Sequence, residues 1–417
     1  MITNRTLRYI TTICLMASLY NAVDAMNVVR PYKFFFNPAP HYGTRWQLFL
    51  RPEYGFNAKG YNPCSCSVNI AQIWQAEENA LAMLNGFDAQ SAIGQERIRV
   101  DAIDDGVRGQ FDVFANLNVD FGCTLAARRA LPHNIMLGIY MPVFTMQLKN
   151  VHWIDKTKDE TAEDIRVHEY LTDHLAGQVS SLGCLNIGSW RRTGLGDMSI
   201  VADWLQDFVA AQPVLRNVRI NGRLGLTLPT GKRENINEIL AIPFGYNGAV
   251  TMIFGGGLNL ALGSYIHIGF DVELREIFGN TSCQRIKTDL GQTELLLLQK
   301  ASVYTDYGME QQYTLYGELY DLVPHTSCKL AYQFFKRGDS LVSLYGNCFS
   351  NAIANTAERI QERNWHEILA TATYDFAYLT REYVRAIPSL SLYAEIPFRG
   401  KRVAVCPILG AIVNVDF

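Results

Sequence analysis

The sequence predicts an all-β fold: a single antiparallel transmembrane β-barrel of about 12 strands, with short periplasmic turns and long extracellular loops. Apolar and polar residues alternate at period two along most of the chain after Pro31. The connections between these segments are short and long in turn, as in outer-membrane barrels. The chain is 48% hydrophobic and only 18% charged, with a net charge of −3. This composition excludes a disordered chain and gives no basic field that would attract nucleic acid.

Residues 1–25 have the three-part layout of a secretory signal peptide. Arg5 and Arg8 precede an apolar stretch, and a small residue two places before Ala25 completes a cleavage signature. We therefore expect cleavage between Ala25 and Met26. A buried N-terminal helix is the alternative interpretation. With cleavage, residues 26–417 form the outer-membrane barrel domain.

The candidate strands show the two-residue period, least clearly at 134–148 and 309–322, where both faces are partly apolar. They span 45–57, 108–124, 134–148, 196–209, 216–229, 247–262, 264–278, 309–322, 328–338, 365–378, 386–398 and 402–417. The clearest alternation runs from Gln110 to Gly122, where Phe111 and every second residue after it are apolar. We expect this apolar face to contact lipid, and the opposite face, with Asp112 and Asp120, to line the lumen.

The long connections, 58–107, 149–195, 230–246, 279–308 and 339–364, are expected outside the cell. Both chain termini and the short turns then lie in the periplasm. Two loop segments, Ile70–Leu84 and Glu160–Leu175, have apolar residues at helical spacing. Their helices would cap or enter the mouth of the barrel, or else be short surface helices without a plugging role.

The last residues support a membrane barrel over a soluble sheet. From Val403 to Phe417, every second residue is apolar, and the chain ends on the aromatic Phe417. Outer-membrane barrels resemble this pattern, which their assembly machinery reads, so Phe417 is predicted to be the insertion signal. In lipid a sheet must close to satisfy its backbone. Aromatic residues near strand ends are candidates for interfacial girdles: Trp46, Trp204, Tyr265, Trp365 and Tyr374.

One of the nine cysteines, Cys14, lies in the signal segment, so eight remain in the exported chain. An even number in an oxidising compartment permits disulfides, although the sequence does not give their connectivity. The cysteines in predicted loops are the likelier ones to be oxidised: Cys64, Cys66, Cys184, Cys283 and Cys348. The alternative is that most cysteines are small apolar fillers.

A family resemblance rests on two neighbouring motifs. Gly-Leu-Gly-Asp ends at Asp197, and the strand that follows the next turn ends in Pro-Thr-Gly-Lys at Lys232. This pair resembles the phenol-degradation-pathway (MetA-pathway) transporter family of bacterial outer-membrane barrels, relatives of fatty-acid and aromatic-hydrocarbon channels. The resemblance covers about residues 193–275, and it implies a barrel that passes small apolar solutes. A role of the motif in the barrel architecture is favoured over ligand contact.

The sequence carries only weak signatures of an enzyme. A barrel lipase would need a serine, a histidine and an orienting polar residue. His267 and His366 lie in predicted strands, the first facing inward and the second outward, but no Gly-x-Ser-x-Gly elbow follows a strand. No metal-ligand spacing stands out, so we expect no enzyme activity, no metal and no cofactor.

The predicted lumen carries charges of both signs. The candidate lining residues are Asp112, Asp120, Asp197, Asp203, Arg219, Arg223, Asp271, Glu273, Arg275, Glu318, Lys329 and Glu395. Twelve strands enclose a bore between a filled eight-stranded barrel and an open porin. We expect an outer-membrane channel for passive uptake of small, hydrophobic or aromatic solutes. The alternatives are a structural or adhesive surface barrel without a pore, or a phospholipase-type hydrolase. The expected partners are outer-membrane lipid, the barrel-assembly machinery and a small solute, with no nucleic acid; the oligomeric state stays open.

Overall fold

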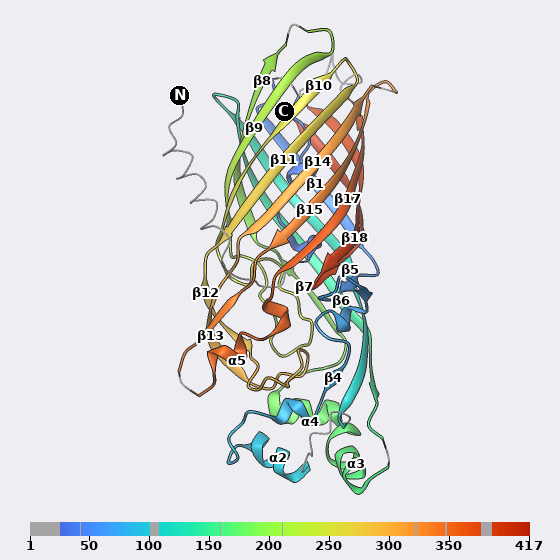
Figure 1. Cartoon of the computed structure of the whole chain (residues 1–417). Helices are drawn as coiled ribbons and strands as arrows, with labels where there is room; N and C mark the ends of the chain where they lie inside the picture. Colours follow the sequence, from blue (N-terminus) through green and yellow to red (C-terminus); the bar gives the residue numbers. More distant parts are fainter. Residues whose placement is uncertain are drawn as a thin grey trace, which may run out of the picture.

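The computed structural model describes residues 26–41, 43–100, 108–158, 160–210, 212–321, 323–346, 348–376 and 386–417. Within them, twelve antiparallel strands follow one another around a closed barrel, and the first strand pairs with the last (Figure 1). The predicted fold class, strand number and strand order are confirmed. The barrel strands are β1 (Trp46–Gly55), β5 (Gln110–Leu131), β6 (Ile135–Asp155), β8 (Met198–Val209), β9 (Leu215–Leu228), β10 (Thr251–Leu262), β11 (Ile266–Ile277), β14 (Glu310–Tyr320), β15 (Thr326–Arg337), β17 (Arg363–Asp375), β18 (Ile387–Lys401) and β20 (Ile408–Asp416).

One end of the barrel has short turns, and the other continues into a folded cap of long loops (Figure 1). The cap strands are β2 (Lys59–Tyr61), β3 (Ser67–Val68), β4 (Glu78–Asn79), β7 (Trp190–Leu195), β12 (Asn280–Arg285), β13 (Lys300–Asp306), β16 (Leu341–Leu344) and β19 (Val403–Val405). Its helices are α2 (Ala92–Val100), α3 (Ala162–Val167), α4 (Leu175–Gly183) and α5 (Asn351–Ala354), with helical turns η3 (Ile70–Gln72), η4 (Ala82–Leu84), η5 (His168–Thr172) and η6 (Glu358–Ile360). None of the described helices is long and apolar enough to cross a membrane.

The outer surface of the barrel is apolar, as the alternation predicts. Leu224, Phe270 and Leu392 are 52%, 46% and 61% exposed on strands whose other face is polar. Trp46 and Trp204 are also exposed, near the short-turn ends of their strands. An exposed apolar band of this kind is typical of a barrel in a bilayer.

The interfacial position predicted for Trp365 is wrong. Its side chain is fully buried and stacks on Phe335, with 3.7 Å between the ring centroids. Along β17 the buried residues are Arg363, Trp365, Glu367 and Leu369, so Trp365 has the parity of the inner face. The place of Trp365 in the two-residue alternation therefore decides that it points inward, despite the preference of tryptophan for membrane interfaces.

In the upper half of the β5–β6 hairpin, which extends into the cap, the apolar side chains point inward and not outward as predicted. Phe111, Val113 and Leu117 are at most 3% exposed and pack in the main buried cluster inside the cap. The register between β5 and β6 shifts between Val119 and Phe121. Because one extra residue reverses the faces of a strand, the apolar side points inward above the shift and toward lipid below it.

The two predicted loop helices have different outcomes. Within residues 160–175, α3 and η5 make 162–172 helical, and α4 begins at Leu175. The Ile70–Leu84 segment is not one helix: it forms two short helical turns separated by strand β4. The buried carboxylate of Glu78 in β4 accepts a hydrogen bond from the backbone N–H of Leu295, so contacts with a distant loop override the helical pattern.

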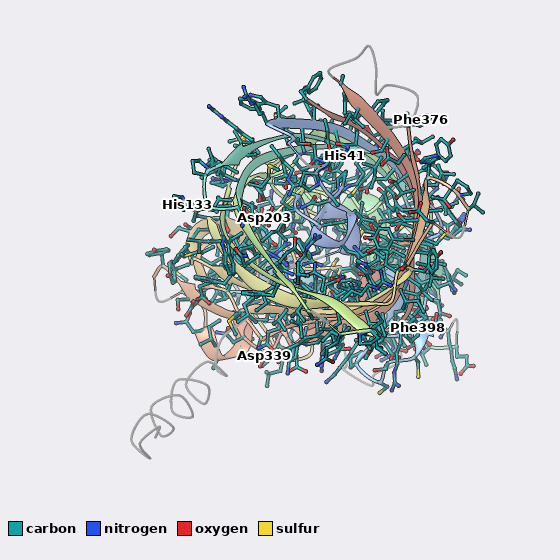
Figure 2. All side chains as sticks on the ribbon, turned by 90° about the horizontal axis from the view of Figure 1, so that it is seen from above. His41, His133, Asp203, Asp339, Phe376 and Phe398 are labelled. Carbon is teal, nitrogen blue, oxygen red and sulfur yellow. The ribbon has the colours of Figure 1, made fainter. Side chains whose placement is uncertain are left out.

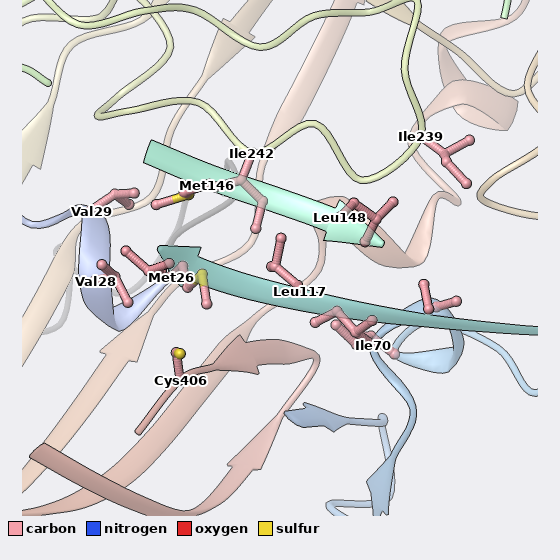
Figure 3. Close-up of a cluster of buried hydrophobic side chains, with 14 of the residues drawn as sticks. Met26, Val28, Val29, Ile70, Leu117, Met146, Leu148, Ile239, Ile242 and Cys406 are labelled. Atoms are coloured by element: carbon pink, nitrogen blue, oxygen red, sulfur yellow. The ribbon is translucent and has the colours of Figure 1, made fainter. Parts of the chain in front are cut away.

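Residues 26–41, which we call the plug, run inside the barrel instead of lying outside it. They contain helical turns η1 (Asn27–Val29) and η2 (Phe34–Phe36). Looking along the barrel from the short-turn end, Figure 2 shows their blue ribbon inside the ring of strands. At the cap end, Met26 and Val28 pack with Ile70, Leu117 and Ile242 (Figure 3). The predicted signal peptide before Met26 lies outside the described residues.

The C-terminal alternation is interrupted once. Val403 and Val405 are buried in the cap, whereas Leu409 and Val413 of β20 are exposed on the outer face. The chain therefore leaves the cap at Pro407 before it enters the barrel wall. The backbone of Phe417 pairs with that of Trp46 and closes the barrel. Its role as an insertion signal stays a prediction.

The eight cysteines after residue 26 are all free thiols in the described structure. Five of the six exposed ones are the loop cysteines predicted to be the likelier to oxidise, and the sixth, Cys328, lies on β15. Cys406 is buried against the plug, where its backbone N–H and carbonyl both bond to Asn27. Cys406 thus packs as a small apolar residue.

Candidate functional site

The inner wall of β9 and β11 carries a buried ion-pair network. The guanidinium of Arg223 donates to Asp271 at 2.9 Å and to Glu273 at 3.0 Å, and Arg275 donates to Glu273 at 2.6 Å. All four side chains are at most 5% exposed. Buried charges are tolerated when each is paired and hydrogen-bonded. The network therefore narrows the lumen without leaving these four charges isolated.

The glycines of β10 make room for this network. A Cβ on Gly257 would lie 2.7 Å from a carboxylate oxygen of Asp271, and one on Gly255 would lie 2.9 Å from the side chain of Arg223. The Gly255–Gly257 run thus lets large side chains of both neighbouring strands cross over β10.

The plug is held in the lumen by polar contacts to four strands. Arg30 faces Glu273 of β11 at 3.6 Å, and the Tyr32 hydroxyl donates to Asp203 of β8 at 2.8 Å. Lys33 lies 2.5 Å from Glu395 of β18 and 3.8 Å from Glu53 of β1. These contacts join the plug to opposite sides of the barrel, so its polar groups fix its position across the bore.

Three consecutive phenylalanines of the plug lie against cations and rings of the wall. The Arg223 guanidinium lies 3.6 Å from the centroid of the Phe34 ring, and Lys329 lies 4.3 Å from that of Phe35. Phe36 packs on Tyr393 with 4.5 Å between ring centroids. Cation–π contacts are stronger when they are desolvated. They therefore hold the phenylalanine rings firmly against the wall, across the middle of the lumen.

His41 fastens the other end of the plug to the short-turn rim. Its two ring nitrogens lie 2.7 Å from carboxylate oxygens of Asp375 and Asp416. Burial lowers the pKa of His41, but its hydrogen bonds to the two carboxylates outweigh that effect and raise the pKa above its ordinary value. Because a carboxylate oxygen lies at each ring nitrogen, both nitrogens can donate to β17 and β20 only in the protonated imidazole.

A cavity of about 580 Å³ lies between the plug and the short-turn end. The phenylalanines of η2 and the segment up to His41 form part of its lining. Its wall also carries charged, aromatic and hydroxyl side chains, among them Arg219, His267, Glu318, Lys329, Thr371, Thr373, Ser389 and Ser391. This volume is within the usual range of small-molecule sites.

The cap closes the opposite end above Met26. Residues of the plug, of η3, of α4 and of the 239–242 loop share one buried cluster. A pocket of only about 60 Å³ remains there, lined by Met26, Trp74, Glu294 and several arginines. The lumen thus has a roomy compartment on the short-turn side and a nearly filled one on the loop side.

Most of the predicted lumen residues lie on the inner face of the barrel. Asp203, Arg223, Asp271, Glu273, Arg275 and Glu395 are buried there, in the contacts described above. Arg219, Glu318 and Lys329 line the cavity. Arg219 also forms an ion pair with Asp207 at 2.8 Å. The structure therefore brings nine of the candidates together around the plug and the cavity.

Asp112 and Asp120 do not line the lumen. Asp112 pairs with Lys156 at 3.0 Å and Asp120 with Arg191 at 3.5 Å, and all four side chains are partly exposed. Asp112 lies above the register shift of β5, where the polar face points away from the core, and Asp120 is the residue at the shift itself. The expectation that they face the bore is corrected by that shift.

Asp197 is an architectural residue of the motif. One carboxylate oxygen accepts from the backbone N–H of Gly231 at 2.7 Å and the other from Tyr246 at 2.6 Å. The Lys232 ammonium donates to the backbone carbonyl of Thr193 at 3.1 Å. A Cβ on Gly231 would lie 2.8 Å from the carboxylate. The two halves of the motif thus clamp the β9–β10 loop onto the bend between β7 and β8.

Neither histidine considered for hydrolysis has a catalytic arrangement within the described residues. His267 faces the cavity and packs against Tyr320, with 4.5 Å between the rings. His366 lies on the outer face and contacts the Tyr332 hydroxyl at 2.7 Å. No serine hydroxyl of the described chain bonds to either ring, and no group of three or more His, Cys, Asp or Glu in that part is placed to hold a metal ion.

Sequence reasoning missed the plug and its partners. A usable signal was present: from Met26 to Pro52 the chain has no acidic residue, while Arg30, Lys33 and three phenylalanines follow one another closely. The cations and rings of this segment are complementary to the carboxylates and cations of the inner face, such as Glu273, Glu395 and Arg223.

No protein-family model matches the chain, and none of the curated proteins is significantly similar to it. Several solved structures are similar over most of its length. An outer membrane channel from Pseudomonas putida F1 aligns 93% of this chain with 100% of its own, at 11% identity and a TM-score of 0.48. The β domain of the Bordetella autotransporter BrkA covers 88% and 98%, at 8% identity and 0.32. A mutant of the monoaromatic hydrocarbon channel TodX covers 96% and 95%, at 9% identity and 0.30.

Proposed function

We propose that this protein is an outer-membrane channel for the passive uptake of small solutes, closed at rest by its own N-terminal plug. The observation that carries the proposal is the way in which the lumen is closed. A chain segment held by ion pairs, hydrogen bonds and ring contacts fills the bore between the 580 Å³ cavity and the cap. Such a segment can leave without breaking the barrel wall.

The physical setting supports an outer-membrane location. The barrel is closed, its outer face is apolar, and its inner face carries paired charges. A closed strand barrel satisfies its backbone without water, as a bilayer requires. In the usual orientation of outer-membrane barrels, the short turns and the cavity face the periplasm, and the cap faces the outside of the cell.

The test is conductance in planar lipid bilayers. We expect small or no steps from the full mature chain. A variant that lacks residues 27–40 should give larger and steadier steps, because the segment across the bore is gone. Arg191→Gln is a matched control, since this arginine is 63% exposed and forms its ion pair with Asp120 of β5. It should conduct like the parent.

A structural or adhesive barrel is the competing function, and its lumen would be filled permanently rather than by a segment that can leave. If the deletion variant still migrates as a folded barrel on an unheated gel but passes no current, the channel proposal is wrong. Lipid hydrolysis that is lost on replacement of His267 or His366 would instead support a hydrolase.

The solute class is expected to include small molecules with apolar or aromatic parts. The cavity has an aromatic side from Phe34, Phe35 and Tyr316 and a hydroxyl-bearing side from β17 and β18. Liposome swelling with neutral aromatic solutes and sugars of similar size tests this preference in the deletion variant. Equal swelling rates for aromatic solutes and sugars would contradict this preference.

A further inference from the structure

The ammonium of Lys33 lies in a cradle formed by three acidic side chains of the barrel wall, Glu53, Glu367 and Glu395. Its nitrogen is 2.5 Å from Glu395 and 3.8 Å from Glu53. The side chains of this lysine and these two glutamates are at most 7% exposed. Glu367, 2% exposed, lines the same small void of about 10 Å³ as Lys33 and Glu395.

The three carboxylates are unequally satisfied by the wall itself. Glu53 accepts from the Tyr393 hydroxyl at 2.6 Å and faces Arg51 at 3.9 Å. Glu367 accepts from Gln333 with one oxygen, and its other oxygen is buried without a partner among the described residues. Glu395 has Lys33 as its close cation.

The local charge therefore depends on the plug. With Lys33 in place, three cations face the three carboxylates: Lys33, Arg51 of the wall and Arg30 of the plug, which lines the same void as Glu367. Removal of Lys33 leaves two of these cations for three buried carboxylates, and departure of the whole plug leaves Arg51 alone of the three. Buried charge without a counter-ion is costly, so an emptied cradle favours entry of another cation.

The shape of the site selects among cations. The Lys33 side chain is a primary ammonium on an unbranched alkyl stem, and aromatic rings of Phe36 and Tyr393 lie beside the cradle. No group of ligand side chains in the described residues is spaced to hold a metal ion. Ring faces and hydrogen-bond acceptors together suit an alkylammonium group better than a bare metal ion.

We propose that this cradle is a binding site for the primary ammonium group of small organic cations, and that Lys33 is its internal, competing occupant. The binding site rests on the wall carboxylates and Tyr393, with Phe36 of the plug beside them while the plug is in place. Its use as a selectivity site for solutes rests in addition on the proposed channel function. Two experiments separate these claims.

The first experiment asks whether an external ammonium replaces the lysine. The variant Lys33→Ala is purified in detergent, and its thermal unfolding midpoint is followed with n-butylammonium or with n-butanol, a neutral molecule of the same length. Butylammonium should raise the midpoint of the variant and leave that of the parent unchanged, and butanol should do neither. Equal shifts with both probes would overturn the proposal.

Lys329→Ala is the matched control, because this lysine also contacts the plug but has a backbone carbonyl and two rings as its partners. It should show no response specific to butylammonium. Adding Glu395→Gln to Lys33→Ala should weaken butylammonium binding about tenfold, the loss expected for a charge-assisted hydrogen bond. Unchanged binding would exclude Glu395 from the site.

Lys33→Met serves if the alanine variant does not fold, since it keeps the stem and removes only the charge. The double variant Lys33→Met/Glu395→Gln should then unfold at a higher temperature than Lys33→Met alone, because one unpaired carboxylate is gone. A lower or equal midpoint would contradict a cradle that requires a cation.

The second experiment measures ion selectivity in the variant lacking residues 27–40. Its reversal potential in a KCl gradient should indicate cation preference, and Glu367→Gln/Glu395→Gln should reduce that preference. Current without cation preference contradicts the selectivity role of the cradle. Absence of current from a folded barrel contradicts the channel function, and the binding site is then judged by the first experiment.

Discussion

The wall formed by β9 to β11 and the upper half of the β5–β6 hairpin show the same two-residue alternation with opposite orientation. In the wall, Leu224 points to the outside and Arg223 to the lumen. In the hairpin, Leu117 points inward and Asp112 outward. The wall has an apolar outer surface and encloses a plug held by ion pairs and hydrogen bonds, whereas the hairpin has charged residues on its outer surface and encloses an apolar core.

The difference teaches that alternation identifies a strand and its two faces but not the surroundings of each face. A strand with one apolar face packs that face against the least polar of its two surroundings. Below the register shift at Val119–Phe121 that is lipid, and above it that is the buried cluster of the cap.

The largest expected effect comes from placing a carboxylate on the apolar face of each region. Leu117→Asp puts a charge into the fully buried cap core and should cost about 5 kcal/mol, because both packing and solvation are lost. Leu224→Asp faces lipid or detergent and should cost about 1–3 kcal/mol. Denaturant titration of the folded gel form in one detergent compares them. Equal costs would break the distinction between the two faces.

The second comparison concerns charges on the polar faces. Arg223→Met leaves Asp271 and Glu273 with fewer buried partners and should cost about 4 kcal/mol. Arg191→Met removes a partly exposed pair with Asp120 and should cost less than about 1 kcal/mol. Unfolding midpoints of the two variants under the same conditions give the answer. A costly Arg191 variant would mean that the outer face of the hairpin is covered.

The smallest effect concerns a carboxyl buried in the cap beside the hairpin. Burial, with a smaller contribution from Glu294, raises the pKa of Glu78 to about 8. Because the folded state favours the protonated form, the contribution of Glu78 should lower the free energy of unfolding by about 3–4 kcal/mol as pH rises from about 5 to about 8. Glu78→Gln should remove this slope, and Glu160→Gln, at an exposed carboxyl, should keep it. An unchanged slope in Glu78→Gln would show that other groups cause it.

The sequence by itself predicted the barrel, all twelve strands and most of the inner face. The reason is that the alternation within each barrel strand shows which of its two faces is polar. It also pointed to the Gly-Leu-Gly-Asp and Pro-Thr-Gly-Lys segments as architecture. The contacts of Asp197 with Gly231 and Tyr246 give the physical form of that role.

Only the tertiary structure decided the rest. The plug has no strand or helix period to reveal it, and its place depends on partners such as Glu273, Asp203 and Glu395, which lie on three strands far apart in the chain. The facing of Asp112 and Asp120 depends on one irregular register step. Alternation is a property of each strand alone. Which segment fills the lumen, and which face of a strand meets solvent, depend on the closed barrel.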